Sequence, residues 1–351
     1  MFHTSYKEAR RAFRNTARDS NFEIASYKLP NLRGIDGESL TIDVAIKGEG
    51  NQFILTSGLH GVEGYAGSGC QIACMKHINF NNMRVILIHA INPYGFSYKS
   101  RTNENAVDLN RNCGGSFPRN YNQEYDHIHD KLRTHIYNNV PPSQSALKKT
   151  LRLLEATLGK SEFAAAITGG QFRHPDGLFY GGDQPQKSLE IVNDILMTHC
   201  SNKASRTLTI DFHTGLGPSG HGELVFTGTS PCRALELVRQ WLPDVTCPAE
   251  GGSVTKSVKG SAEQIFIRDD LGHQVSYAAL EFGTLPMTDV LLALCGDIWL
   301  NRHTKIDAHV ANRIRTDMFA AFCGTTDEWR ASVLKKTHKV VKQAVHALST
   351  Y

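Results

Sequence analysis

Residues 51–92 read "NQFILTSGLHGVEGYAGSGCQIACMKHINFNNMRVILIHAIN", and this stretch contains two apolar segments separated by a longer polar and small-residue segment. The apolar segments "NQFILTSG" (51–58) and "RVILIHAIN" (84–92) have the length and composition of buried strands. The middle of the segment between them suits a helix. A strand, a helix and a second strand in this order predict a βαβ unit, and hence a parallel pair of strands.

Further strand-like segments occur on both sides of this unit. They are "FEIASYKL" (22–29), "LTIDVAIKG" (40–48), "RTLTIDFHTG" (206–215), "GELVFTG" (222–228) and "VSYAALEFGT" (275–284). Helical patterns lie between most of them. We therefore expect an α/β fold with a mixed, mostly parallel, twisted sheet of about eight strands and helices on both faces.

The chain contains no internal repeat, low-complexity tract or obvious linker, so we expect residues 1–351 to form one domain. We expect an N-terminal helix at about 3–19, an insertion at about 114–185 and a helical tail at about 287–350. The insertion ends in a loop rich in glycine and proline. Such long irregular segments are usually functional or serve as lids.

The composition, with 40% hydrophobic and 21% charged residues, is that of an ordinary globular protein. The formal charge of +4 is small and the basic residues are spread out, which argues against a nucleic-acid partner. The sequence has neither a signal-peptide h-region nor a membrane span. Its eight scattered cysteines form no CxxC pair. These features predict reduced thiols and a cytoplasmic protein without a membrane partner.

Four polar clusters follow the predicted strands, where open α/β sheets place their ligands. They are His60 with Glu63, the stretch from Arg101 to Asn112, Asp211 with His213, and Glu281. The first pair offers an imidazole and a carboxylate, which are good zinc ligands. A satisfied loop histidine beside a surface glutamate would look the same, and both interpretations stay open for the pair alone. Glycines at positions 58, 61, 64, 67 and 69 favour the metal, because they permit positive φ and close approach of the backbone to a ligand.

A catalytic zinc usually has three protein ligands and leaves one position open. His213 lies at the end of the predicted strand 206–215, so its side chain should emerge at the rim of the sheet. His89 is a competitor, but it lies inside its strand and is more typical of a core histidine. His213 is therefore the third candidate ligand.

The stretch from Arg101 to Asn112 leaves the strand 84–92 and gathers several directional hydrogen-bonding groups. Arginine binds carboxylates bidentately, so Asn110 with Arg111 could hold a substrate carboxylate, and Arg101 could face an oxyanion. A solvated loop with surface ion pairs is the alternative.

Glu281 ends the apolar strand 275–284, and a carboxylate at such a position requires a partner. Water activated by a metal would serve, with Glu281 as its general base. The alternative is a buried structural ion pair.

The segments "HGVEG", "NPYGF" leading to "VDLNRN", "DFHTG" and "LEFGT" follow one another in this order at predicted strand ends. In this order they resemble the zinc carboxypeptidase superfamily, which includes the succinylglutamate desuccinylase and aspartoacylase branch. The similarity spans residues 50–285. More narrowly, the whole chain resembles bacterial cytoplasmic members of this superfamily that have no characterised function.

The resemblance implies that His60, Glu63 and His213 bind Zn²⁺. It also implies that Glu281 is the general base and later the proton donor. Asp108 matches the carboxylate that orients the first histidine, a partner that metal-bound histidines commonly require.

The resemblance further implies that Asn110 and Arg111 hold the terminal carboxylate of the substrate. Arg101 matches the arginine that polarises the scissile carbonyl. Lys99 is a competing choice, because the branches of the superfamily differ in this loop.

One feature of carboxypeptidases is missing. They carry a mobile tyrosine some two dozen residues before the catalytic glutamate, and residues 251–264 contain none. Tyr180 or Tyr277 could compensate, although either suits a packing role. The difference weakens the assignment as a carboxypeptidase more than the assignment as a hydrolase.

We therefore expect a zinc-dependent hydrolase that cleaves an amide bond next to a free carboxylate, most simply a metallocarboxypeptidase-like peptidase. The alternatives are an N-acyl-amino-acid deacylase and a non-catalytic metal or small-molecule binder. The expected partner is a small peptide or an N-acyl amino acid, in a pocket built from 114–182 and 247–270. A GxGxxG at 215–222 suggests a dinucleotide-binding oxidoreductase, but Pro218 and a strand follow where a helix is required.

Overall fold

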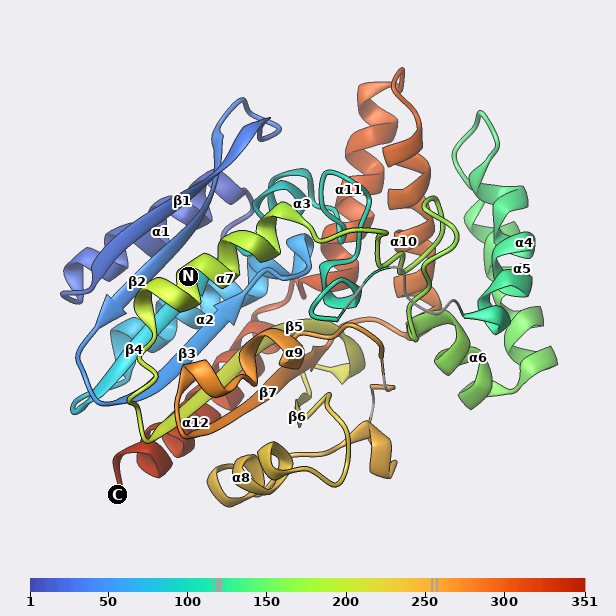
Figure 1. Cartoon of the computed structure of the whole chain (residues 1–351). Coiled ribbons are helices and arrows are strands. Elements are labelled where there is room, and N and C mark those ends of the chain that lie inside the picture. The colour runs from blue at the N-terminus through green and yellow to red at the C-terminus, as the bar shows by residue number, and fades with distance from the viewer. Residues whose placement is uncertain (116, 118–121, 254, 257, 351) are drawn as a thin grey trace.

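The computed structural model describes residues 1–115, 117, 122–253, 255–256 and 258–350. Its strands form a single mixed sheet (Figure 1). In chain order they are β1 (Glu23–Arg33), β2 (Ser39–Lys47), β3 (Asn51–Ser57), β4 (Met83–His89), β5 (Arg206–Ser219), β6 (Gly222–Val225) and β7 (Gln274–Gly283). The order across the sheet is β1-β2-β4-β3-β5-β7-β6.

The centre of the sheet is parallel and its two edges are antiparallel. Strand β3 pairs in parallel with β4 and with β5, and β5 pairs in parallel with β7. Strands β1 and β2 on one side and β6 on the other run antiparallel to their neighbours. This confirms the α/β fold and the predicted βαβ unit, with seven strands in the described residues where we expected about eight.

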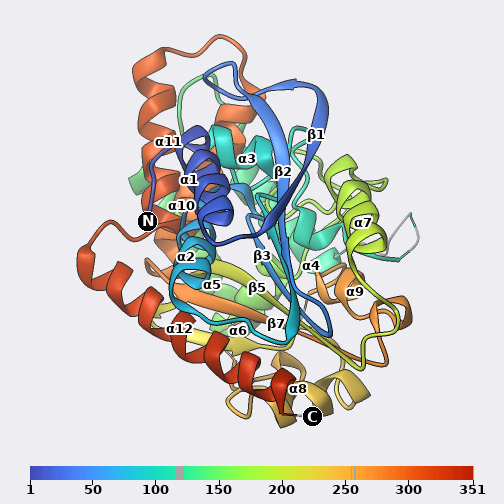
Figure 2. The same ribbon diagram turned by 90° about the vertical axis from the view of Figure 1, so that its left-hand side faces the viewer.

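Helices cover both faces of the sheet, as predicted. They are α1 (Tyr6–Asp19), α2 (Gly64–His77), α3 (Pro93–Tyr98), α4 (Gln123–Ile136), α5 (Gln144–Leu158), α6 (Lys160–Thr168), α7 (Lys187–His199), α8 (Arg233–Trp241), α9 (Glu263–Phe266), α10 (Met287–Arg302), α11 (Ala308–Phe322) and α12 (Asp327–Ser349). Figure 2 shows α1, α2 and α12 on one face and α7 and α9 on the other. Helices α4, α5, α6 and α10 lie beyond the carboxyl ends of the parallel strands (Figure 1).

Helix α1 shows how the sequence pattern produces this packing. Tyr6, Ala9, Phe13 and Ala17 recur every three or four residues and are all buried. The helix therefore presents one apolar face to the protein. The Ser5 side chain accepts a hydrogen bond from the backbone N–H of Glu8 and caps the first turn. Burial of a large apolar side chain such as that of Phe13 contributes about 1.5–3 kcal/mol.

The glycines after β3 have a different role from the one we expected. Of the five, Gly58 has a positive φ of 71°, whereas Gly61, Gly64, Gly67 and Gly69 have ordinary helical or turn backbone. A Cβ on Gly61 would lie 2.1 Å from the carbonyl carbon of Gly95, and one on Gly67 would lie 2.6 Å from the Cβ of Ser57. These glycines let α2 pack tightly against β3 and α3. The expectation that they form a loop around a ligand is wrong.

No helix in the described part of the chain is both long enough and apolar enough to cross a membrane.

Candidate active site

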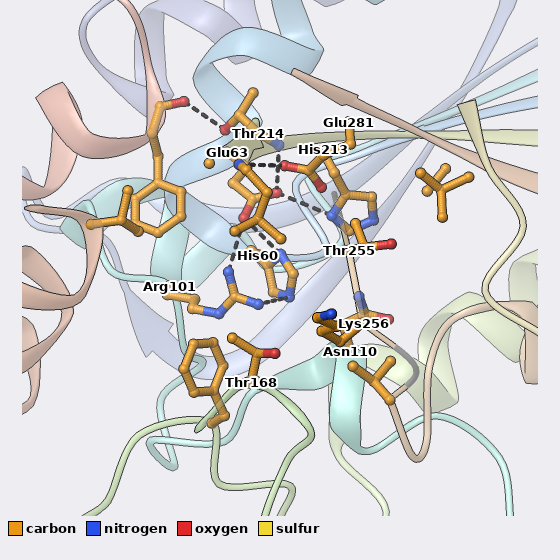
Figure 3. A pocket seen from close by; sticks show the side chains of 18 of the residues that line it. His60, Glu63, Arg101, Asn110, Thr168, His213, Thr214, Thr255, Lys256 and Glu281 are labelled. Carbon is orange, nitrogen blue, oxygen red and sulfur yellow. Dashed lines mark hydrogen bonds and ion pairs between the residues drawn. The ribbon is translucent and has the colours of Figure 1, made fainter. Parts of the chain in front are cut away.

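His60, Glu63 and His213 come together at the carboxyl ends of two neighbouring parallel strands. His60 and Glu63 follow shortly after β3. His213 lies in β5, one residue after the partner of the last residue of β3. One ligand atom from each side chain lies within 4.8 Å of the other two, and all three residues are buried (Figure 3). The parallel pairing of β3 with β5 therefore brings His213 to His60 and Glu63, although it lies 150 residues after Glu63 in the chain.

The donor atoms of these residues face one another. The Nδ1 atom of His60 lies 2.8 Å from Oε1 of Glu63, and the Nδ1 atom of His213 lies 3.1 Å from Oε2 of the same carboxylate. Nδ1 of His60 makes no hydrogen bond to any described residue, although it is buried. Buried polar atoms are normally paired, so such a nitrogen requires an explanation. Two imidazole nitrogens and a carboxylate suit a zinc ion, so the residues fit the predicted metal.

The second nitrogen of each histidine is held by a buried aspartate. Nε2 of His60 lies 3.1 Å from Asp108, and Nε2 of His213 lies 2.7 Å from Asp211. At His213 a proton on Nε2 that is donated to Asp211 leaves the Nδ1 lone pair free for a metal. Nε2 of His60 also lies 2.7 Å from Nη2 of Arg101, a group that can only donate. Asp108 lies where the resemblance places it. We had assigned no role to Asp211, although its position two residues before His213 puts both side chains on one face of the strand.

Two carboxylates of the site have pKa values shifted in opposite directions. Burial alone would raise the pKa of Glu63, but His60 and His213 lower it more, so it is held well below its usual range. Burial and the nearby Glu63 charge together raise the pKa of Glu281 to about 8. Pairs of acids that are pushed apart in this way are typical of sites that use one as a fixed anion and the other as a proton carrier.

Arg101 connects the histidine partners. Its Nε donates to Asp108 over 2.9 Å, and its Nη1 donates to Glu63 over 3.0 Å. Its guanidinium also lies 5.1 Å from the ring centroid of Phe179. Lys99, the alternative from the sequence, lies over the ring of Phe319 and does not line the pocket. The structure thus brings Arg101, and not Lys99, to the candidate metal site.

Asn110 and Arg111 line the same pocket, whose volume is about 800 Å³ when the adjoining open solvent is included. Nε and Nη2 of Arg111 donate to the carbonyl oxygen of Thr168 over 3.2 and 2.6 Å. Burial lowers the pKa of Arg111 to about 10, so it stays charged at neutral pH. The side-chain oxygen of Asn110 accepts a hydrogen bond from the Ala262 N–H, and this bond orients its amide group.

Glu281 stands beside His213, because these two residues are direct partners in the pairing of β5 with β7. One oxygen of Glu281 accepts a hydrogen bond of 3.0 Å from the backbone N–H of Leu216. The hydroxyl of Tyr277 lies 3.4 Å from Asp211 and lines the pocket, whereas Tyr180 does not. Of the two tyrosines considered from the sequence, Tyr277 is therefore the one at the site.

The pocket extends beyond the segments that we predicted. Residues 114–182 contribute Thr168 and Phe179, and residues 247–270 contribute Lys256 among others. Positions 116, 118–121, 254 and 257 of these ranges lie outside the described residues. We had not expected the wall supplied by the C-terminal helices. It consists of Met287, Val290, Leu291, Leu294 and Phe322.

The chain belongs to a family described as "Protein of unknown function (DUF2817)", which matches residues 2–336. A comparison with curated proteins found no match.

Solved structures with a similar fold include two carboxypeptidase-related proteins and an amidase. Bovine thrombin-activatable fibrinolysis inhibitor, in complex with tick carboxypeptidase inhibitor, is 14% identical, with a TM-score of 0.45 over 90% of this chain and 97% of that one. A metallo-carboxypeptidase from Burkholderia cenocepacia is 11% identical, with a TM-score of 0.39 over 90% and 70%. Murein-tripeptide amidase MpaA from Escherichia coli O157 is 14% identical, with a TM-score of 0.37 over 81% and 93%. At these low scores the function of this chain rests on its own site geometry.

Proposed function

We propose that this protein is a zinc-dependent hydrolase that cleaves an amide bond next to a free carboxylate. The observation that carries the proposal is the convergence of His60, Glu63 and His213 in a pocket that also contains Glu281. These three residues would hold the ion. When bound, zinc at such a site lowers the pKa of a water molecule and polarises a carbonyl group.

Glu281 would move the proton. Its raised pKa of about 8 keeps it close to the range in which a carboxyl group can both accept and donate a proton near neutral pH. The hydrogen bond from the Leu216 N–H fixes one oxygen, so the carboxyl group has a defined direction. Glu281 would take a proton from the attacking water and return it to the leaving amine.

Arg101, Asn110 and Arg111 would bind and orient the substrate. Arg101 is held by Asp108 and Glu63 and can donate to an oxygen that becomes negative during the reaction. Arg111 and the amide group of Asn110 would bind the carboxylate on the amine side of the bond. Fixing both the carbonyl and the carboxylate orients the scissile bond, which is a large part of catalysis.

A non-catalytic binder on the same scaffold is the weaker alternative. A buried glutamate with a raised pKa beside three facing donor groups has little structural purpose. Both a peptidase and an N-acyl-amino-acid deacylase would use the site described above.

The test is the replacement Glu281→Gln in the zinc-loaded protein, assayed on C-terminal dipeptides and on N-acyl amino acids with a chelator control. We expect hydrolysis to fall by about 10²–10⁴-fold while zinc stays bound, because a general base contributes that much. Glu223→Gln is the matched control. Glu223 is the cross-strand partner of Glu281 and is buried, but it accepts a hydrogen bond from Thr246 and does not line the pocket.

Full activity in the Glu281→Gln variant would rule out its role as the base. An inactive wild-type protein that binds zinc stoichiometrically would instead favour the binder.

A further inference from the structure

We infer that the amide that this protein hydrolyses carries a large apolar group on its acyl side. This inference rests on the proposed function and names the substrate class of that same site. It follows from the division of the pocket into an apolar wall and a polar wall.

The apolar wall is a row along one face of α10. Met287, Val290, Leu291 and Leu294 are spaced by three, one and three residues, which places them on one side of the helix, and all four line the pocket. The row spans about 10 Å along the helix axis. Phe322, the last residue of α11, extends this wall beside the metal ligands, since its carbonyl accepts a hydrogen bond from Thr214.

The polar wall belongs to segments other than the C-terminal helices and consists of Asn110, Arg111, Thr168 and Lys256. Strands β6 and β7 add the apolar residues Val225 and Ala279 to the same pocket. In Figure 3 the labelled Asn110 and Lys256 lie below His213, Thr168 lies below Arg101, and the red-toned ribbon of the C-terminal helices lies at the left. If the polar wall holds the carboxylate on the amine side, the acyl group must lie against the apolar wall.

The apolar wall also continues past the site. A second cavity, with about 540 Å³ of empty volume, shares Arg101, Phe179 and Leu294 with the first and follows the same helix. Its lining along the helix is mixed, because Ile298 lies between the polar residues Asp297 and Asn301. The apolar surface that begins at the metal ligands therefore extends to Ile298, one turn beyond Leu294.

The test is a series of zinc-dependent hydrolysis rates for N-acetyl, N-butanoyl, N-hexanoyl and N-octanoyl derivatives of one amino acid. Each buried methylene contributes about 0.8 kcal/mol, so kcat/KM should rise about fourfold per methylene until the wall is covered. Blocked dipeptides with alanine or leucine on the acyl side form a second arm, which distinguishes a linear acyl chain from an apolar amino-acid side chain.

Leu291→Asn should remove most of this preference, and Leu292→Asn is its matched control. Leu292 is the next residue on α10, but it lines a different cavity. The measured quantity is the ratio of kcat/KM for the hexanoyl and acetyl substrates within each variant, because this ratio does not depend on the folded fraction. We expect Leu291→Asn to lower the ratio about tenfold and Leu292→Asn to leave it unchanged.

Binding gives a readout without turnover. Glu281→Gln loaded with zinc should bind the N-hexanoyl amino acid at least tenfold more tightly than the N-acetyl one, as measured by calorimetry. Equal rates and equal affinities along the series would overturn the inference and leave the proposed hydrolase standing. Failure to hydrolyse any of these amides would overturn the proposed function itself.

Discussion

Two clusters of charged residues, each around a buried carboxylate, lie at different strands of this sheet, and they are completed in different ways. The candidate active site contains Glu63 between two histidines. The second, which we call the Asp43 cluster, consists of Asp43, Arg10, Arg14 and Ser26. Nε of Arg10 and Nη1 of Arg14 each donate to Asp43 over 2.6 Å, and the Ser26 hydroxyl donates to it over 2.5 Å.

A histidine accompanies the Asp43 cluster as well. His89 stacks on Phe13 with ring centroids 4.4 Å apart, and its Nε2 lies 2.9 Å from the Ser68 hydroxyl. Burial lowers its pKa to about 4, so it is neutral. The prediction of a core histidine is confirmed. Its Nδ1 also lacks a hydrogen bond within the described residues, but it belongs to no group of facing ligand atoms.

The comparison separates structural from functional burial. In the Asp43 cluster each carboxylate oxygen accepts hydrogen bonds from cationic or hydroxyl donors, so its charge is balanced inside the protein. At the candidate site, Nδ1 of His60 and Nδ1 of His213 both face the Glu63 carboxylate, which also accepts hydrogen bonds from Arg101 and from the Thr214 N–H. Burial of a histidine and a carboxylate is common to both regions. Only at the candidate active site do ligand atoms of three side chains lie close enough to one another to share a cation.

The largest expected difference between the two regions is in the zinc content of histidine variants. His213→Ala removes one of three ligands, and we expect zinc content to fall from one equivalent per chain to a small fraction. His89→Ala should keep its zinc, because His89 lies outside the group of facing donors. Elemental analysis of both variants measures this, and equal stoichiometry in the two would mean that His213 is not a ligand.

Asp211 tests the partners of the ligands. Asp211→Asn keeps the shape of the side chain but weakens its hold on Nε2 of His213. We expect zinc affinity to fall about 10- to 100-fold, which is the usual effect of losing such a partner. Competition with a chromogenic chelator measures the affinity. An unchanged value would show that the 2.7 Å contact has no influence on the ligand.

Asp43 tests the opposite side of the comparison. We expect Asp43→Asn to lower the free energy of unfolding by about 2 kcal/mol, because charged hydrogen bonds are lost and two arginines remain partly buried. Urea denaturation at pH 7 measures this change. Zinc content should stay at the wild-type level, and its loss would contradict a purely structural role.

The smallest expected effect concerns the pH dependence of that difference. Burial alone would raise the pKa of Asp43. Arg10 and Ser26, which donate hydrogen bonds to it, lower this pKa by more than burial raises it, so the net shift is downward. The stabilisation by Asp43 is therefore complete above the ordinary value of 3.8 and is lost as the pH falls through the lowered value. The unfolding free energies of wild type and Asp43→Asn should converge on acidification. A constant difference would show that ionisation of Asp43 is not its source.

The sequence predicted the parts of the site that depend on strand ends. The apolar runs located β3, β5 and β7, and the polar residues that follow them lie at one edge of the parallel sheet. Asp211 was within reach of the same reasoning, because alternate residues of a strand share a face.

The apolar wall was not predictable in this way. Helix α10 has buried residues around much of its circumference, so its sequence does not show which of them face a cavity and which face the core. The role of the glycines after β3 was wrongly predicted for a related reason. Their close contacts are with Gly95 and Ser57, which only the packed structure reveals.

The direct pairing of His213 with Glu281 has a consequence for how the protein can be handled. A slip of β7 by one residue against β5 would turn Glu281 to the opposite face of the sheet, and a slip between β3 and β5 would separate the ligands. Under the proposed function, an ion would be held, and water activated beside it, only in molecules whose central strands have paired correctly. In a refolded preparation, metal content would then report on the register of β3 with β5, and turnover per metal on the register of β5 with β7.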